Sequence, residues 1–470
     1  MKTRVISMIL LASLSVGTAV SCGQNGSVSD TSAGTDMSSE SISDTAEPEK
    51  KYDFGGADFN VIGGNGAMIN FPYDEENGDV INDILVARDR YIEETYNIRI
   101  RYNVTESEEA CNTLMNSVLA GDNAYDMLAA TAIDAGKIAL KNALYDIFDM
   151  DGITTDAPYW SRLVSENCHL NGRLYFLSGD ILPVIYTMPS CIFMNCDVAE
   201  KYGIGKDEVF KVVEDREWTI DKLIGYTKDT STDLNGDGVI KVADDFVGYA
   251  SLEGSLAAGV LAVGSGIRLC TENDDGMITV DLMNDRVLGL IGKAKVLFAD
   301  YKANTDSDSL HQALRENRFI FSQHYTSSAF TRYRDVEADY SILPIPKYDD
   351  AQDSYYSMLN PWMRAFASFP MYVDTEKAAV ISEAMARYSY ENVRPVVYED
   401  GFKLKGARDS DSAKMLDLIF DTAYLDNNAV YDFGGSMTIL SKAVFLGGDF
   451  ASAYTSAEPR IEADIAKLYE

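Results

Sequence analysis

Segments patterned as β-strands alternate with segments patterned as α-helices after residue 51, and this alternation constrains the fold more than any other feature. It implies an α/β fold with a mostly parallel sheet covered by helices on both faces. Ligands of such sheets bind beyond the carboxyl ends of the strands, here in the loops at residues 64–73 and 131–135. The expected strands are residues 58–63, 98–104 and 125–131, and the expected helices are residues 80–96, 108–120 and 135–140.

The remainder of the chain continues this pattern around a helix-rich middle at residues 197–315. Asn171-Gly172 is a residue pair that two-residue β-hairpins prefer. A chain of 470 residues is long enough for two lobes or domains. The further expected strands are residues 319–322 and 340–343, and the further expected helices are residues 375–390 and 413–422.

The N-terminal segment has the composition of an export signal. Lys2 and Arg4 precede an apolar run over residues 5–20 that is too short for a membrane span. Ala19-Val20-Ser21-Cys22 then resembles a bacterial lipobox, after which the signal is removed and the cysteine is lipidated. We expect residues 1–21 to be a lipoprotein signal peptide and Cys22 to carry lipid, with simple cleavage to a soluble product as the alternative.

A polar stretch without aromatic residues follows Cys22. Residues 24–51 are rich in Ser, Thr, Asp and Glu, so they cannot bury enough apolar surface to fold. A random coil of this length reaches roughly 30 Å. We expect residues 22–52 to form a lipidated, disordered tether, and the two acyl chains of its anchor would hold the folded body near a membrane.

The charge balance excludes one large class of partner. The chain has 40 Lys plus Arg against 74 Asp plus Glu, a formal net charge of −34. Nucleic-acid-binding proteins concentrate positive charge on one face, so we expect no nucleic-acid partner. The 28 Tyr and 19 Phe residues instead favour a surface or cleft that holds an amphipathic molecule.

Motifs for catalysis are not found in the sequence. It contains no phosphate-binding loop, zinc-protease motif, nucleophile elbow or dinucleotide-binding motif. Its three histidines, His169, His311 and His324, lie far apart along the chain, which disfavours a histidine metal site. No enzymatic activity is therefore expected.

The cysteines do not form a complete disulfide framework. Five remain when Cys22 is assigned to lipid, and an odd number excludes complete pairing. Cys191 and Cys196 flank a short apolar run and are interpreted as small buried residues, with a disulfide as the alternative.

One acidic loop has the spacing of an EF-hand-type calcium loop. Such loops supply oxygen ligands at alternate positions and place a glycine at the sharp turn, here Gly238. The position of Lys241 departs from the pattern, because an ammonium group cannot bind a cation. We expect a structural Ca²⁺, with an acidic turn held by its own hydrogen bonds as the alternative. The expected ligands are Asp233, Asn235, Asp237, Val239 and Asp244.

Several further segments carry a family resemblance through their order along residues 53–440. They are residues 77–83, 157–160, 170–180, 218–221, 233–249, 340–349, 355–356 and 394–409. In this order they resemble the extracellular solute-binding lipoproteins of bacterial carbohydrate ABC importers, the family-1 group that includes maltose-binding protein. The resemblance implies a class II periplasmic-binding-protein-like fold, in which two α/β lobes are joined by hinge crossings and a ligand cleft lies between them.

The same resemblance implies approximate lobe boundaries. Lobe 1 would comprise residues 53–188 and 362–395, and lobe 2 would comprise residues 189–361 and 396–470. The hinge crossings would lie near residues 186–190 and 360–369.

Candidate ligand-binding residues follow from this arrangement and from the chemistry of sugars. A sugar has an apolar ring face and a fringe of hydroxyl groups, so its site needs flat aromatic rings and polar groups. Trp218 begins a helix and is expected to pack in the core instead. The aromatic candidates are Trp160, Tyr186, Tyr325 and Trp362, and a position in the core is the alternative for the two tryptophans. The polar candidates, for which a surface position or a structural ion pair is the alternative, are His324, Asp126, Asp180 and Arg364.

The resemblance implies a non-enzymatic receptor. It would capture a carbohydrate, most simply an oligosaccharide, on the extracellular face of a bacterial membrane and deliver it to the permease subunits of an ABC importer. The lipid anchor would be its only membrane contact, and the protein would act as a monomer. The alternative is a surface glycan-binding or sensory lipoprotein without an importer partner. Peptides and lipid-linked solutes remain competing ligand classes, because aromatic clefts also bind those.

Overall fold

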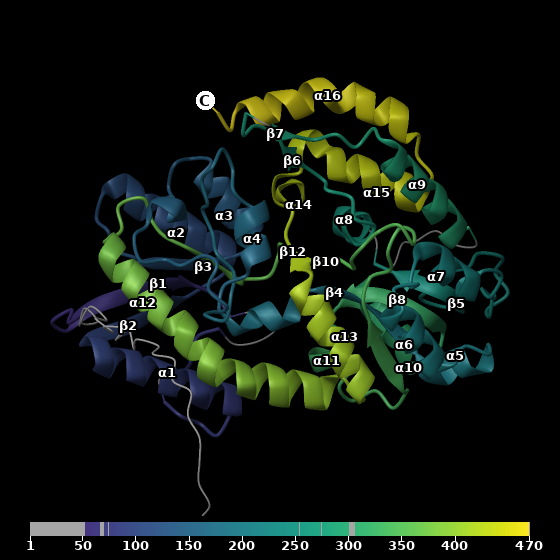
Figure 1. Cartoon of the computed structure of the whole chain (residues 1–470), viewed down its shortest axis with the longest axis horizontal. Helices are drawn as coiled ribbons and strands as arrows, with labels where there is room; N and C mark the ends of the chain where they lie inside the picture. Colours follow the sequence, from purple (N-terminus) through teal and green to yellow (C-terminus); the bar gives the residue numbers. More distant parts are fainter. Residues whose placement is uncertain are drawn as a thin grey trace, which may run out of the picture. The chain divides into compact units, whose positions relative to one another are not determined.

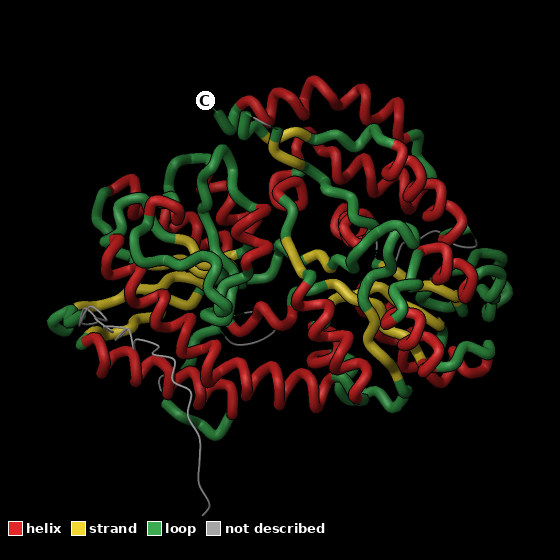
Figure 2. The backbone as a smooth tube through the Cα atoms, viewed as in Figure 1, coloured by secondary structure: helices red, strands yellow, loops and turns green. Residues whose placement is uncertain are grey.

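The computed structural model describes residues 52–65, 70–73, 75–252, 254–273, 275–299 and 306–469, except for the side chains of residues 402 and 404–406. The expected signal peptide, Cys22 and nearly all of the tether lie outside the described residues. Residues Tyr52–Glu470 form a single unit. Its longer strands gather in two groups that are each covered by helices (Figures 1 and 2). We call the first sheet with its helices lobe 1 and the second sheet with its helices lobe 2.

The sheet of lobe 1 has the strand order β11-β3-β1-β2. β1 pairs in parallel with β2 and β3, whereas β11 pairs with β3 in the antiparallel direction. Alternate residues of β3 enter two different core clusters, Met127 in one and Leu128 in the other. The expected mostly parallel sheet with two covered faces is therefore confirmed. The strands are β1 (Ala57–Gly63), β2 (Ile98–Val104), β3 (Met127–Ala130) and β11 (Phe366–Ser368).

Helices cover both faces of this sheet. Leu114 of α2 joins the core cluster on the Leu128 side of β3, and Ile381 of α12 joins the cluster on the Met127 side. The side chain of Asp79 accepts hydrogen bonds from the first turn of α1, which explains where that helix begins. The helices of lobe 1 are α1 (Val80–Tyr96), α2 (Ser107–Ala120), α3 (Ala132–Ala139), η1 (Ile147–Asp149), α4 (Arg162–Asn167), η2 (Pro183–Thr187) and α12 (Thr375–Tyr388).

The sheet of lobe 2 has the strand order β5-β8-β4-β9. β5 and β8 are parallel, and β4 is antiparallel to both β8 and β9. β5 lies inside the stretch expected to be helix-rich, and its sequence Val-Gly-Tyr-Ala-Ser has no alternating pattern because every residue is buried. The strands are β4 (Ser190–Asn195), β5 (Val247–Ser251), β8 (Phe319–Tyr325) and β9 (Tyr340–Leu343), with the short pairs β6 (Thr271–Glu272) and β7 (Ile278–Thr279), and β10 (Ser357–Met358) and β12 (Ala423–Tyr424).

Helices complete lobe 2. Trp218, which precedes α7, is fully buried and donates from its indole nitrogen to the Pro344 carbonyl at 2.9 Å, so its expected core role is confirmed. The helices are α5 (Cys196–Lys201), α6 (Lys206–Glu214), α7 (Ile220–Thr227), α8 (Ser255–Gly264), α9 (Asp285–Leu297), α10 (Ser307–Arg315), α11 (Ser327–Thr331), α13 (Ser410–Asp421), α14 (Asn427–Tyr431), η5 (Phe433–Gly435), α15 (Ser436–Leu446) and α16 (Phe450–Ala466).

The chain passes between the two lobes at three places in the described residues. The first passage runs from η2 into β4, and the second connects β10 to β11. The third is helical: α12 continues through the π-helical segments η3 (Ser389–Val393) and η4 (Pro395–Gly406) towards α13 (Figure 1). α12 packs on α1, whereas η4 contacts α13. One continuous helical rod therefore joins the lobes.

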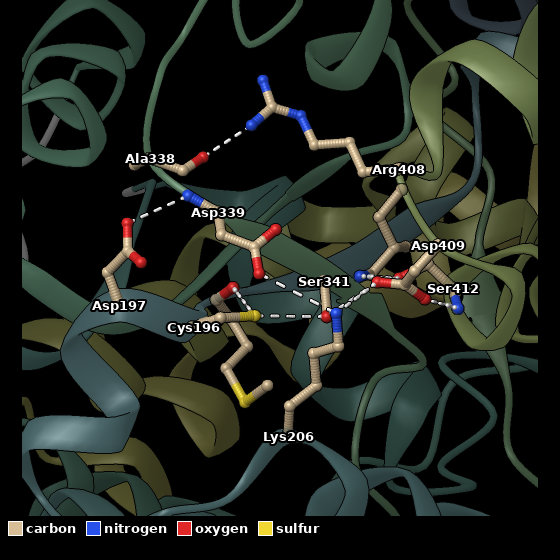
Figure 3. A network of polar contacts seen from close by, with 11 residues as sticks. Cys196, Asp197, Lys206, Ala338, Asp339, Ser341, Arg408, Asp409 and Ser412 are labelled. Atoms are coloured by element: carbon tan, nitrogen blue, oxygen red, sulfur yellow. Dashed lines mark hydrogen bonds and ion pairs between the residues drawn. The ribbon is translucent and has the colours of Figure 1, made fainter.

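A polar network fixes the end of this rod to lobe 2 (Figure 3). Asp409 accepts hydrogen bonds from the Ser412 backbone at 2.6 Å and from Lys206 Nζ at 3.1 Å. Arg408 lies over the ring of Tyr340 at 4.2 Å and adopts a φ of 57°. Its guanidinium donates to three carbonyl groups that precede β9, those of Tyr333, Val336 and Ala338. The backbone turn at Arg408 is held by these contacts.

The cysteines of the described residues are all free thiols. Cys191 is buried and Cys196 is half-buried, with its Sγ 3.3 Å from Ser341 Oγ. The alternative of a disulfide between them is wrong. Burial raises the pKa of Cys196 to about 11 and that of Cys111 to about 12, so these thiols stay protonated near neutral pH. None of the described helices has the length and apolar character that a membrane crossing requires.

Candidate functional site

A cavity of about 240 Å³ lies between the two lobes. Lobe 1 contributes two segments to its wall, one before and within α4 and one around η2. The third passage contributes Arg394, and lobe 2 contributes the end of α13 and the start of β12. The lining residues are Pro158, Tyr159, Trp160, Ser161, Arg162, Leu163, Gly179, Asp180, Ile185, Tyr186, Leu359, Arg394, Phe420, Asp421 and Ala423. Three of the expected ligand-binding residues, Trp160, Asp180 and Tyr186, meet here.

Trp160 is held in the wall of the cavity by a buried carboxylate. Glu383 of α12 accepts a hydrogen bond from Trp160 Nε1 at 2.7 Å and another from the hydroxyl of Tyr159. The backbone of Trp160 also pairs with that of Gly179. A Cβ at Gly179 would come within 2.2 Å of the Tyr159 carbonyl and 2.8 Å of the Trp160 ring, so only glycine permits this approach.

Asp180 and Tyr186 form a buried hydrogen-bonded pair. The Tyr186 hydroxyl donates to Asp180 Oδ1, and both residues are less than 5% exposed. Burial raises the pKa of Asp180 to about 6, although the Tyr186 hydrogen bond and the charge of Arg394 oppose this shift. Burial also raises the pKa of Tyr186, so its hydroxyl remains a donor. The pair thus places beside the cavity a carboxyl group whose pKa is raised to about 6.

Arg394 faces this acceptor from the π-helical rod. Its Nη1 lies 3.9 Å from Asp180 Oδ2, and its side chain is 32% exposed. Tyr390 and Tyr398, four positions before and after it, share its helix face, and the guanidinium lies 5.5 Å and 5.4 Å from their ring centroids. The Tyr398 ring stacks on Tyr186 at 5.3 Å. The site therefore combines a cation, an anion and aromatic walls.

Arg394, Phe420 and Asp421 were not among the residues predicted for the site. Arg394 lies at the start of a segment of the family resemblance, and the spacing Tyr-x-x-x-Arg-x-x-x-Tyr was the available signal for it. Nothing in the local sequence marks Phe420 and Asp421, because they reach the cavity only through the packing of α13.

Tyr325 and His324 lie outside the lining of this cavity. Tyr325 is buried at the end of β8, opposite Ser190 at the first passage. His324 is buried in lobe 2 with its ring centroid 5.2 Å from that of His311. Burial and the neighbouring positive groups lower the pKa of His324 to about 3 and that of His311 to about 4. The two histidine rings thus meet where α10 packs against the following strand, β8.

Asp126 and Arg364 also lie away from the cavity, in ion pairs of lobe 1. Asp126 Oδ1 is 2.8 Å from Lys377 Nζ, and its other oxygen accepts from the Asn60 backbone at 2.8 Å. Arg364 donates to Glu106 and to the Asn65 carbonyl. Both side chains therefore form structural ion pairs, which were the expected alternative to ligand binding.

Trp362 lies at the second passage beside the carboxyl end of β3. The preceding residue, Pro361, accepts a hydrogen bond from the Ala132 backbone at 3.0 Å, which places this segment next to the expected ligand loop at residues 131–135. The side chain of Trp362 is 54% exposed. The other expected ligand loop, residues 64–73, contains positions outside the described residues. Trp362 thus presents an unburied ring near the sheet edge.

The acidic loop is closed by its own backbone hydrogen bonds. Asp233 accepts from the backbone nitrogens of Gly236 and Gly238, and Asp237 accepts from Val239. Asn235 accepts from the Asp237 backbone at 2.8 Å, and Asp244 is exposed. Within the described residues, no group of three or more His, Cys, Asp or Glu side chains is arranged to hold a metal ion. Calcium binding by this loop stays a prediction.

No protein-family model matches the chain, and no curated protein matches it significantly in sequence. Solved structures match over most of its length. The cyclic α-maltosyl-1,6-maltose binding protein from Arthrobacter globiformis has a TM-score of 0.60 at 12% identity, covering 87% of this chain and 99% of its own.

Two further structures, which are binding proteins of ABC transporters, match similarly. The galacto-N-biose/lacto-N-biose I-binding protein from Bifidobacterium longum, in complex with lacto-N-biose, has a TM-score of 0.56 at 13% identity, covering 88% and 98%. A substrate-binding protein from Listeria monocytogenes, in complex with cycloalternan, has a TM-score of 0.54 at 11% identity, covering 87% and 99%. The chain therefore has the two-lobed α/β fold of the solute-binding proteins of ABC transporters.

Proposed function

We propose that this protein is a receptor that captures a carbohydrate between its lobes and delivers it, chemically unchanged, to an ABC importer. The observation that carries the proposal is the cavity between the lobes, whose wall combines aromatic rings with the Asp180–Arg394 pair. Aromatic faces suit sugar rings, and paired donors and acceptors suit hydroxyl groups. The shared fold supports the same role, since structures with this fold were solved with lacto-N-biose and with cycloalternan.

We propose an oligosaccharide as the ligand, and a screen tests this directly. Thermal shift is measured for the purified folded body with mono- and oligosaccharides, and with amino acids and short peptides. An oligosaccharide should raise the melting temperature, because a ligand that binds only the folded state stabilises it. A shift with peptides or amino acids and none with any glycan would contradict the carbohydrate assignment. Release of new reducing ends during incubation would contradict a binding role.

The cellular location is part of the proposal. Lipidation at Cys22 would hold the protein at the extracellular face of a bacterial membrane, with the lipid as its only membrane contact. Expression of the full chain in a bacterial host with labelled palmitate tests this. The label should appear in the wild type and disappear in Cys22→Ser, which should be released from the membrane fraction. Equal release of both forms would favour cleavage to a soluble product.

A surface glycan-binding or sensory lipoprotein without an importer would share the same site. The two roles differ in the need for a permease. Neighbouring permease genes and permease-dependent uptake of the bound glycan support import. Glycan binding without any effect on uptake supports the alternative.

A structural Ca²⁺ in the loop of Asp233, Asn235, Asp237, Val239 and Asp244 is also proposed. The loop supplies oxygen atoms with the spacing that calcium prefers.

A further inference from the structure

We propose that the Asp180–Arg394 pair makes the cavity select an uncharged, hydroxylated sugar ring over an acidic one near neutral pH. The inference rests on the proposed function and narrows its ligand class. Three features of the cavity carry it: the open donors of Arg394, the buried acceptor Asp180 and the balance of charge around them.

Arg394 has donors to offer. A guanidinium carries five N–H groups in a fixed fork. Among the described residues its only charged partner is Asp180, at 3.9 Å, and this exceeds hydrogen-bond distance. The ring faces of Tyr390 and Tyr398 flank the group without using its in-plane donors. A ligand acceptor in the cavity can therefore bind Arg394 without displacing a protein hydrogen bond.

Asp180 supplies the complementary acceptor. Its Oδ1 accepts from the Tyr186 hydroxyl, and its Oδ2 is the atom that faces Arg394. A sugar hydroxyl both donates and accepts, so neighbouring hydroxyls can accept from Arg394 while donating to Asp180. Phe420 in the same wall is half-buried, so its ring can cover the apolar face of a sugar ring.

The charges in the cavity disfavour the binding of a ligand carboxylate. Arg162 and Asp421 also line it, and Arg162 Nη1 already pairs with Glu166 at 3.1 Å. Asp180 offsets the charge of Arg394, from which its Oδ2 lies 3.9 Å, so the pair offers a ligand carboxylate little net attraction. A carboxylate that enters the cavity would therefore lose its hydration without full electrostatic compensation, whereas a neutral hydroxyl loses much less.

Protonation of Asp180 should remove this selectivity. Burial raises its pKa to about 6, so the group becomes neutral at moderately acidic pH, where a uronic acid is still charged. The titratable and charged groups that face it or share the cavity are Tyr186, Arg394, Arg162, Asp421 and Tyr159, with Tyr398 behind Tyr186. None of the tyrosines ionises in this range, because burial raises the pKa of Tyr159, Tyr186 and Tyr398.

Calorimetric titrations of the folded body test the inference. The probes are the neutral trisaccharides maltotriose, cellotriose and xylotriose and the acidic trisaccharide of galacturonic acid, at about pH 7.5 and about pH 5. At least one neutral glycan should bind at pH 7.5 while the acidic one binds at least tenfold more weakly. The acidic glycan should gain at least about tenfold at the lower pH. Equal affinities of the neutral and acidic glycans at pH 7.5 would overturn the inference and leave the proposed function standing.

Two variants separate the roles of the pair. Asp180→Asn should give the acidic glycan at pH 7.5 the affinity that the wild type shows at pH 5, and its binding should no longer depend on pH. Arg394→Gln should weaken the neutral glycan at least about tenfold. Arg90→Gln is the matched control, because Arg90 is an exposed arginine of α1 paired with Glu76.

Circular dichroism and melting temperature verify that each variant is folded. If Arg394→Gln does not fold, the Asp180→Asn result decides alone. Glycan binding that neither variant changes overturns the inference and leaves the proposed function standing. If no glycan binds the wild type at either pH while the protein is folded, both the function and the inference fall.

Discussion

The backbone of Gly136, in the middle of α3, lies directly against the ring of Tyr431 from α14. A Cβ at Gly136 would come within 2.8 Å of this ring. α3 belongs to lobe 1, whereas α14 also packs on α8 and α15 of lobe 2. Glycine inside a helix costs about 1 kcal/mol relative to alanine, so its use here fits a close contact between the lobes.

Gly136→Ala should therefore weaken ligand binding without weakening α3. The added methyl group pushes Tyr431 away from α3 and disfavours the arrangement in which the lobes meet. We expect at least a threefold loss of glycan affinity, on the order of 0.7 kcal/mol, by calorimetric titration, with helix content retained. Gly292→Ala is the control, since Gly292 lies in α9 with nothing within 4 Å of its added Cβ. Unchanged affinity in Gly136→Ala would show that the contact between Gly136 and Tyr431 does not support the ligand-bound state.

Trp362→Ala should lower glycan affinity at least about tenfold while the fold persists. The ring is 54% exposed, so its loss leaves little cavity in the core, and it stands at the sheet edge where ligands of this fold class bind. Titration and melting temperature are the measurements. Tyr372→Ala provides a control of similar exposure, at 57%. An equal affinity in wild type and Trp362→Ala would place the ring outside the site.

The buried His311–His324 pair should make lobe 2 sensitive to acid. Both pKa values are lowered, to about 4 and about 3, so the unfolded chain binds protons that the folded chain does not. Stability is therefore fully present above about pH 6.5 and falls as the pH drops towards 4. Each group contributes at most about 1.4 kcal/mol per pH unit in this window. Arg332, Arg315, Asp306 and Asp308 are the charged groups around the pair.

His311→Leu tests this sensitivity, because neither nitrogen of His311 has a hydrogen-bond partner among the described residues. The free energy of unfolding, from urea titrations at several pH values, should decline less steeply in the variant between about pH 6.5 and pH 4. Gln312→Ala changes an exposed neighbour on the same helix and should keep the wild-type slope. An unaltered slope in His311→Leu would refute the assignment.

Calcium added to chelator-treated protein should raise the melting temperature and release heat if the acidic loop is a calcium site. Both signals should disappear in Asp233→Asn and weaken in Asp244→Asn, because each change removes a charged ligand. Magnesium, which demands a smaller and more regular cage, serves as the control ion. No response to calcium in the wild type would establish the alternative, an acidic turn that its own hydrogen bonds hold.

Asp245→Ala should destabilise the protein with or without calcium. The carboxylate of Asp245 is fully buried and accepts from the backbone nitrogens of Leu234 and Lys241 at 2.9 and 2.8 Å. Its removal leaves two donors without partners, at a cost of about 1–3 kcal/mol. Urea unfolding in the presence of a chelator measures this cost, with exposed Asp244→Ala as the matched control. Equal stabilities of Asp245→Ala and the wild type would show that the loop folds without the two hydrogen bonds to Asp245.

Local signals predicted much of lobe 1 but less of lobe 2. The expected helix at residues 80–96 matches α1, because its cap at Asp79 and its amphipathic pattern are both encoded within the segment. Asn171 and Gly172 both adopt positive φ angles, as the expected hairpin turn requires. β5 was not predicted, because a strand buried on both faces has no alternation of apolar and polar residues.

Three residues of the site were predicted from the family resemblance, and others were missed because contacts between distant parts of the chain place them at the cavity. Trp160, Asp180 and Tyr186 were anticipated, and they line the cavity. Asp126 instead pairs with Lys377, a partner that only the folded chain brings near. The position of Arg394 depends on a π-helical passage between the lobes, which sequence periodicity did not indicate.

The free thiols of the described residues have a practical consequence for building an optical sensor from this protein. Burial raises the pKa of every described cysteine, including Cys168, Cys191 and Cys270, so all of them react slowly with maleimide dyes. A cysteine introduced at the exposed position 421, on the rim of the cavity, would be labelled first. A fluorophore there could report ligand capture without prior removal of the native cysteines from the folded body.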